Sequence, residues 1–84
     1  MRREEYLKIC AKYPVVEAGG EYCWTPKTCR QFTGLKSVNT IYNWIKKTKN
    51  GEMDLPILSP KFKKHRVLIP VRPFLSWFGY EGQN

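Results

Sequence analysis

The sequence predicts a small α+β domain of the winged helix-turn-helix class, on three features. Two short helices within residues 24–50 are joined by a glycine-containing turn, which is the pattern of a helix-turn-helix. A lysine-rich β-hairpin at 51–70 then predicts a basic wing, and residues 71–79 predict a short closing C-terminal helix. Because 84 residues supply a single core, we expect one domain, 1–84, that begins with a helix and turn at 1–23.

The first segment, residues 2–13, is predicted to be a helix that ends before Pro14. Its apolar residues recur at spacings of three and four and therefore share one helical face. They are Tyr6, Ile9, Cys10 and Tyr13. Gly19-Gly20 follows and predicts a turn between two brief strands.

Both central helices carry start and stop signals. Thr25 is predicted as the N-cap before Pro26, and Gly34 ends this helix because glycine readily adopts the left-handed conformation. Ser37 is predicted to cap a second helix at 38–49. The polar residues of the first helix, which we expect to face solvent, are Lys27, Arg30 and Gln31.

The outer face of the second helix carries amides and lysines but no acid. Amide side chains bind adenine edges and lysine contacts guanine or phosphate, so this face predicts a site for double-stranded DNA. The candidate DNA-binding residues of the recognition helix are Ser37, Asn39, Thr40, Asn43, Lys46 and Lys47. Those of the first helix and the turn are Lys27, Arg30 and Lys36.

The predicted hairpin joins an apolar run at 55–58 to another at 67–69. The loop between them is strongly basic, and such a wing is placed to contact phosphates or the minor groove. Phe62 packs beneath the hairpin or lies against a sugar edge, and its preference for burial favours the first. The candidate DNA-binding residues of the wing are Lys61, Lys63, Lys64, His65 and Arg66.

The closing helix carries an aromatic stripe, formed by Phe74, Trp77 and Phe78. In so small a domain we expect this stripe to belong to the core. Trp44, on the apolar side of the second helix, is predicted to lie in the same core as Trp77. The residues expected around these two tryptophans are Phe32, Ile41, Ile69 and Phe74.

The charge of the chain favours nucleic acid as the partner. Fifteen Lys and Arg against seven Asp and Glu give a formal charge of +8, which attracts polyanions. No apolar run approaches the roughly 18 residues of a membrane-spanning helix, so we expect no membrane partner. The N-terminus lacks the apolar stretch of a secretory signal. An odd number of irregularly spaced cysteines is no disulfide framework, which predicts a cytoplasmic protein.

Catalytic and metal sites are not expected. Cys10, Cys23 and Cys29 are irregularly spaced and His65 is the only histidine, a pattern that matches neither a disulfide framework nor a zinc site. Cys29 is expected to be a small core residue. The sequence has no paired nucleophile and base, no paired carboxylates and no phosphate-binding loop, so we expect no enzyme and no cofactor.

These features occur in an order that resembles the excisionase-like branch of the MerR-type winged-helix proteins, over about residues 24–78. In the two helices the resemblance is carried by Thr25-Pro26, Cys29, Gly34-Leu35 and Thr40-Ile41-Tyr42-Asn43-Trp44-Ile45. It continues through Leu55-Pro56, the basic hairpin, Ile69-Pro70 and Phe74-x-x-Trp77. The chain departs from the family in a turn one residue longer and in a longer hairpin that contains Pro60. Where the first helix of the family has acids, this chain has Lys27, Thr28 and Arg30.

The resemblance implies an excisionase, a recombination directionality factor of a phage or mobile element. Such a protein binds and bends DNA beside an integrase or recombinase and beside further copies of itself. The alternative is a small transcriptional regulator of a mobile element. Either role implies a bacterial or phage-encoded protein associated with the nucleoid. From the residues alone, a module that binds RNA or protein remains a rival, and the N-terminal helix, with Tyr6 and Tyr13, is the surface left for contacts between copies.

Overall fold

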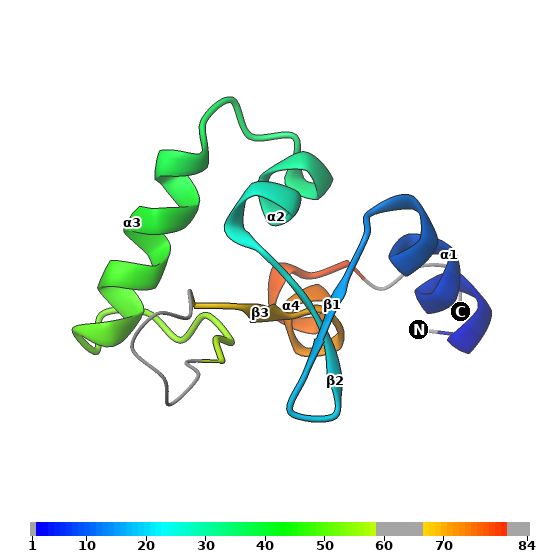
Figure 1. Ribbon diagram of the computed structural model, residues 1–84. Helices are drawn as coiled ribbons and strands as arrows, with labels where there is room; N and C mark the ends of the chain where they lie inside the picture. Colours follow the sequence, from blue (N-terminus) through cyan, green and yellow to red (C-terminus); the bar gives the residue numbers. More distant parts are fainter. Residues whose placement is uncertain (1, 59–66, 81–84) are drawn as a thin grey trace.

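The computed structural model describes residues 2–58 and 67–80, which form four helices and a three-stranded antiparallel sheet (Figure 1). The helices are α1 (Arg3–Lys12), α2 (Pro26–Thr33), α3 (Val38–Lys49) and α4 (Val71–Phe78). The strands are β1 (Val16–Ala18), β2 (Glu21–Trp24) and β3 (Ile69–Pro70). The predicted α+β class is therefore confirmed.

Strand β2 lies at the centre of the sheet, between β1 and β3. β1 and β2 form an antiparallel hairpin in which Glu17 lies opposite Tyr22. The turn of this hairpin is Gly19-Gly20, with φ values of 59° and 78° that residues with a side chain rarely adopt. The predicted turn between two brief strands is confirmed.

Strand β3 attaches the second predicted hairpin to this sheet. Ile69 pairs with Trp24 of β2, a pairing that the sequence analysis does not contain. Within the described residues, the hairpin itself has one antiparallel bridge, between Leu58 and Leu68, with N–H···O distances of 2.7 and 2.9 Å. The base of the hairpin is therefore fixed to the same sheet that forms part of the core.

The centre of the core is Trp24, whose side chain is completely buried. The rings of Tyr13, Phe32 and Phe74 surround it at centroid distances of 6.1, 4.9 and 6.0 Å. Its indole N–H donates to the carbonyl oxygen of Tyr13 at 2.9 Å, so the buried donor has a partner. The other buried core residues, among them the predicted Cys29, are Ile9, Cys29, Ile41, Ile45, Leu55, Ile69, Val71, Phe74 and Leu75.

The prediction that Trp44 and Trp77 are core residues is only partly correct. Their rings meet edge to face with centroids 5.6 Å apart, but both side chains are half-buried and pack against the core from its edge. The indole N–H of Trp77 donates to the carboxylate of Asp54 at 2.8 Å. A tryptophan whose indole N–H needs a polar partner is favoured where one edge of the ring reaches solvent or a polar group. This requirement is consistent with the position of Trp77 at the edge of the core.

The closing helix buries a different stripe from the predicted one. Phe74 is buried as expected, but Val71 and Leu75 are buried beside it, and Phe78 is 43% exposed. Strand β3 leads directly into α4, so the first turn of this helix faces the core. Its last residue extends beyond the core, although the ring of Phe78 still stacks on that of Phe74 at 5.3 Å.

Helix α1 packs the predicted face against the core. Ile9 is buried, and Tyr6, Cys10 and Tyr13 are partly buried beside it. Tyr13 and Tyr6 are both half-buried, and the ring of Tyr13 contacts those of Trp24 and Phe32 edge to face.

Candidate nucleic-acid interface

Helices α2 and α3 begin at the predicted caps. The Thr25 hydroxyl accepts a hydrogen bond from the Thr28 N–H at 3.3 Å, and Gly34 ends α2 with a φ of 76°. The Ser37 hydroxyl accepts from the Asn39 N–H at 3.1 Å and caps α3. These bonds satisfy N–H groups that the first turn of a helix leaves unpaired, so both helix starts are stabilised locally.

Arg30 holds the turn between the two helices. Its Nη1 donates to the carbonyl oxygen of Leu35 at 3.0 Å, and its side chain is half-buried. The expectation that Arg30 faces solvent is therefore wrong, because the returning turn brings a backbone acceptor within its reach. Lys27 and Gln31 of the same helix are exposed as predicted.

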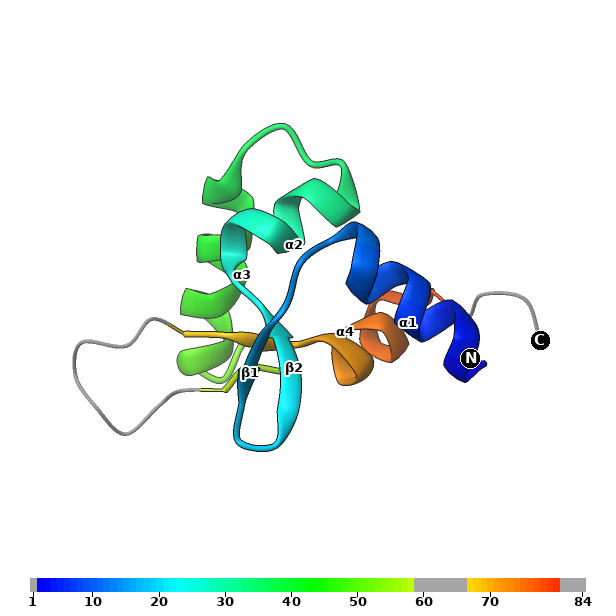
Figure 2. The same ribbon diagram turned by 45° about the vertical axis from the view of Figure 1, so that its right-hand side comes forward.

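Helix α3 has one buried face and one exposed polar face. Ile41 and Ile45 lie in the core. Asn39, Asn43 and Lys46 are exposed on the opposite side, at helical spacings of four and three, and we call them the polar stripe. Figures 1 and 2 both place α3 at one side of the molecule with α1 at the other. The polar stripe therefore lies on an outer surface.

The other α2–α3 candidates differ in accessibility. Lys36 and Lys47 are exposed, as is Lys27 on α2. Thr40 is half-buried, and the Ser37 hydroxyl is engaged in capping α3. Sequence reasoning thus selects three residues of one stripe together with flanking cations. Of the two hydroxyl groups, that of Thr40 is half-buried, and that of the exposed Ser37 already accepts the capping bond.

Tyr42 is a residue of this outer surface that the sequence analysis did not select. It is 48% exposed and lies three residues after Asn39 and four before Lys46, so helical spacing was the available signal. Its ring borders an open hollow of about 460 Å³, here called the α3 hollow, between α3 and the base of the second hairpin. The residues that line the α3 hollow are Pro26, Tyr42, Ile45, Lys49 and Val67.

The charge of the chain is unevenly distributed. Residues 23–51, which contain α2 and α3, carry six Lys or Arg and no Asp or Glu. Residues 1–22 carry four of each. The positive potential is therefore stronger around α2 and α3 than around residues 1–22, and it attracts polyanions there.

The wing candidates Lys61, Lys63, Lys64, His65 and Arg66 lie outside the described residues, as do Pro60 and Phe62. What the structure does describe is the point where their segment joins the fold. This is the bridge between Leu58 and Leu68, beside Val67 of the α3 hollow.

All three thiols have raised pKa values. Burial raises the pKa of Cys29 to about 12 and also raises the pKa values of Cys10 and Cys23. A thiol with a raised pKa is a poor nucleophile at neutral pH. In the described part of the chain, no three His, Cys, Asp or Glu side chains gather as ligands for a metal ion.

Comparisons with models of protein families, with curated proteins and with solved structures found no match. A functional assignment therefore depends on the residues and geometry of this chain. None of the helices in residues 2–58 and 67–80 has the length and apolar character needed to cross a membrane.

Proposed function

We propose that this protein is a winged helix-turn-helix that binds double-stranded DNA in a sequence-dependent manner, with α3 in the major groove. The observation that carries the proposal is the polar stripe of Asn39, Asn43 and Lys46, which is exposed directly opposite the buried face of α3. A helix face that is only solvated usually mixes acids with its cations. This one carries amides and lysines, with Tyr42 beside them, and no acid.

The chemistry of the polar stripe suits the edges of base pairs. The major groove of B-DNA is about 12 Å wide and admits an α-helix. Asparagine can bind the N6 and N7 edge of adenine with two hydrogen bonds, and lysine can bind guanine or phosphate. Asn39 and Asn43 are four residues apart, or about 6 Å along the helix axis, which is close to two base-pair steps. Tyr42 and the α3 hollow beside them offer apolar contact to a thymine methyl group.

Phosphate contacts come, in this proposal, from the cations around the polar stripe. The exposed lysines around it are Lys27, Lys36, Lys47 and Lys49. The hairpin is the wing, and we assign its basic residues 61–66 to the adjacent backbone or the minor groove. Such contacts position the protein and give salt-dependent affinity, but they carry no sequence information.

The resemblance to excisionases supports a more specific role. We propose that the target is the attachment-site DNA of a phage or mobile element, and that the protein acts there as an excisionase beside an integrase or recombinase. Regulation of transcription from such an element is the alternative role. Both roles place the protein in the cytoplasm of a bacterium, on the nucleoid. Footprinting on the DNA around the gene separates them, since one predicts protection of an attachment site and the other protection of a promoter.

The experiment that tests DNA binding starts from duplexes selected from a random pool by the wild-type protein. Asn39→Ala and Asn43→Ala should each lose about 1–3 kcal/mol of preference for the selected duplex over a scrambled one. Their affinity for the scrambled duplex should hardly change. Lys8→Ala, at an exposed position of α1, is the control and should alter neither affinity.

Two results would contradict the proposal. The first is full retention of the preference by both asparagine variants, which would remove α3 from the base-reading surface. The second is tighter binding to single strands or structured RNA than to duplex DNA at one salt concentration. That result would favour an RNA-binding module, in which the exposed ring of Tyr42 stacks on an unpaired base.

A further inference from the structure

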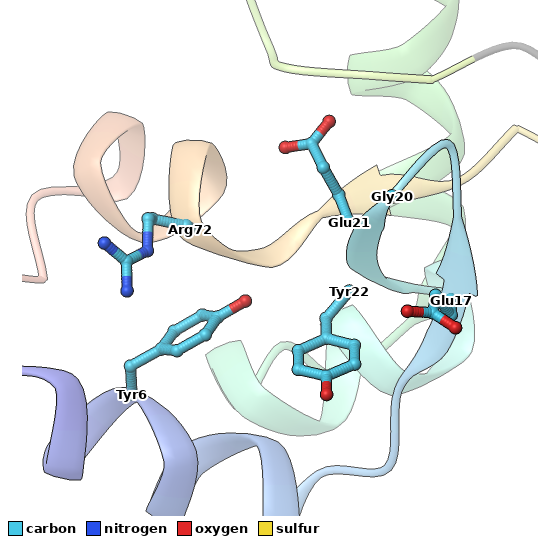
Figure 3. A pocket seen from close by; sticks show the side chains of 6 residues that line it. All are labelled: Tyr6, Glu17, Gly20, Glu21, Tyr22 and Arg72. Atoms are coloured by element: carbon cyan, nitrogen blue, oxygen red, sulfur yellow. The ribbon is translucent and has the colours of Figure 1, made fainter.

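A second hollow, here called the α1 hollow, lies between α1, the β1–β2 hairpin and the start of α4 (Figure 3). It consists of two adjoining depressions of about 380 and 220 Å³ that share Tyr6, Tyr22 and Arg72. The larger depression is also lined by Glu17, Gly20 and Glu21, and the smaller by Arg3 and Leu7. None of these residues belongs to α2 or α3, so this surface is distinct from the proposed DNA interface.

Aromatic and aliphatic side chains form the middle of the α1 hollow. The rings of Tyr6 and Tyr22 stack with centroids 6.4 Å apart and an interplanar angle of 27°. Tyr22 is 40% exposed and Leu7 is 44% exposed. Large apolar side chains gathered at one exposed site mark a surface that a partner covers.

The α1 hollow has a basic lip and an acidic lip. Arg3 and Arg72 belong to α1 and α4, whereas Glu17 and Glu21 belong to the β1–β2 hairpin. Figure 3 shows Arg72 on one side of the tyrosine rings and Glu17 on the other, while Glu21 extends from the same hairpin in the direction away from the Tyr22 ring. All four charged side chains are exposed.

Arg72 is oriented to bind a carboxylate. Its guanidinium carbon lies 4.5 Å from the centroid of the Tyr6 ring. The ring covers one face of the guanidinium and leaves its N–H edge accessible. That edge can bind a carboxylate through two parallel hydrogen bonds. The contact with Tyr6 also restricts the side chain before any partner arrives, which lowers the entropy lost on binding.

We infer that the α1 hollow is the contact surface between two copies of this chain, which meet there as a two-fold symmetric dimer. A two-fold axis that passes between the tyrosine rings exchanges the two lips. Arg72 of each copy then faces the Glu17 side of the hairpin of the other, and the apolar middle of each hollow covers that of its partner. The α1 hollow carries positive charge on one lip and negative charge on the other, so it is complementary to a second copy of itself. For this reason we assign a second copy of the chain as its partner.

The charge distribution also favours contact at this end of the chain. Two chains of formal charge +8 repel one another, and the repulsion is strongest between surfaces that carry cations alone, such as residues 23–51. Residues 1–22 carry equal numbers of acids and bases, so two copies approach there at a lower electrostatic cost than at residues 23–51. A dimer of this kind leaves α3 of each copy uncovered and does not depend on the proposed DNA binding.

Sedimentation equilibrium of the full chain without DNA tests the inference. A small contact surface gives a weak dimer. The wild type should therefore pass from monomer to dimer as the protein concentration rises from about 1 µM to 1 mM. Arg3→Glu/Arg72→Glu makes both lips acidic, and Glu17→Arg/Glu21→Arg makes both lips basic. Each variant alone should dimerise at least about tenfold more weakly because like charges face each other. An equimolar mixture of the two should associate again, since each acidic lip then meets a basic one.

The control variant is Lys8→Glu/Lys12→Glu. It changes the net charge by the same amount as Arg3→Glu/Arg72→Glu, but both of its positions are exposed on α1 and lie outside the hollow. It should dimerise like the wild type. Far-UV circular dichroism verifies that every variant is folded. A wild type that stays monomeric up to about 1 mM, lip variants that dimerise as well as the wild type, or a mixture no better associated than its components would overturn the inference.

Discussion

Replacing Trp24 by alanine tests whether the core is centred where the structure places it. The side chain is completely buried against the rings of Tyr13, Phe32 and Phe74, and its indole N–H donates to the Tyr13 carbonyl oxygen. Truncation of a buried tryptophan costs about 3–5 kcal/mol. A domain of 84 residues has a total stability of about 4–13 kcal/mol, so the Trp24→Ala variant loses a quarter of its stability or more.

Trp77→Ala is the matched comparison, because the same substitution removes a half-buried indole at the edge of the core. It loses the ring contact with Trp44 and the hydrogen bond to Asp54, and we expect a cost of about 1–3 kcal/mol. Urea unfolding followed by far-UV circular dichroism measures both variants. A Trp77→Ala variant that is less stable than Trp24→Ala would refute this description of the core and restore the one expected from the sequence.

Three further predictions concern the turn, the buried thiol and the wing. Arg30→Ala should lower the free energy of unfolding by about 1 kcal/mol in urea titrations, because the Leu35 carbonyl loses its donor, whereas Lys27→Ala on the same helix should not. Burial raises the pKa of Cys29 from 9.0 to about 12, so the folded state holds this proton more tightly than the unfolded chain does. The stability from this thiol is present below about pH 9 and falls as the pH rises toward 12, so the difference in stability between wild type and Cys29→Ala should shrink over that range. In the wing, loss of each phosphate contact should lower the slope of log K against log salt by about 0.9, on selected and scrambled DNA alike. An unchanged slope after neutralisation would remove the wing from the interface; the cations to neutralise are Lys61, Lys63, Lys64 and Arg66.

The helices of this fold were predictable because their signals are local. Thr25, Gly34 and Ser37 act within one helical turn of their own positions, and each takes the role that its residue type predicts. The polar stripe of α3 was predictable for the same reason, since helical periodicity alone places Asn39 and Asn43 on one side.

The features that sequence reasoning missed depend on contacts between distant residues or on the path of the chain. Trp24 becomes the centre of the core because α1, α2 and α4 converge on β2, and no spacing within β2 indicates this. The edge position of Trp77 depends on Asp54, which lies 23 residues away. Arg30 turns inward only because the chain returns past it and offers the Leu35 carbonyl.

Helix α3 joins the core to the proposed DNA interface, and this determines which variants are informative about function. Ile41 and Ile45 are buried, so any change in them alters the fold as well as the outer surface. Asn39, Asn43 and Lys46 are exposed and bury no core surface, so substitutions there act on binding with little effect on unfolding. A loss of binding with unchanged stability at the polar stripe therefore reports a lost contact. The same loss after a core substitution such as Trp24→Ala reports only that the helix is no longer held in place.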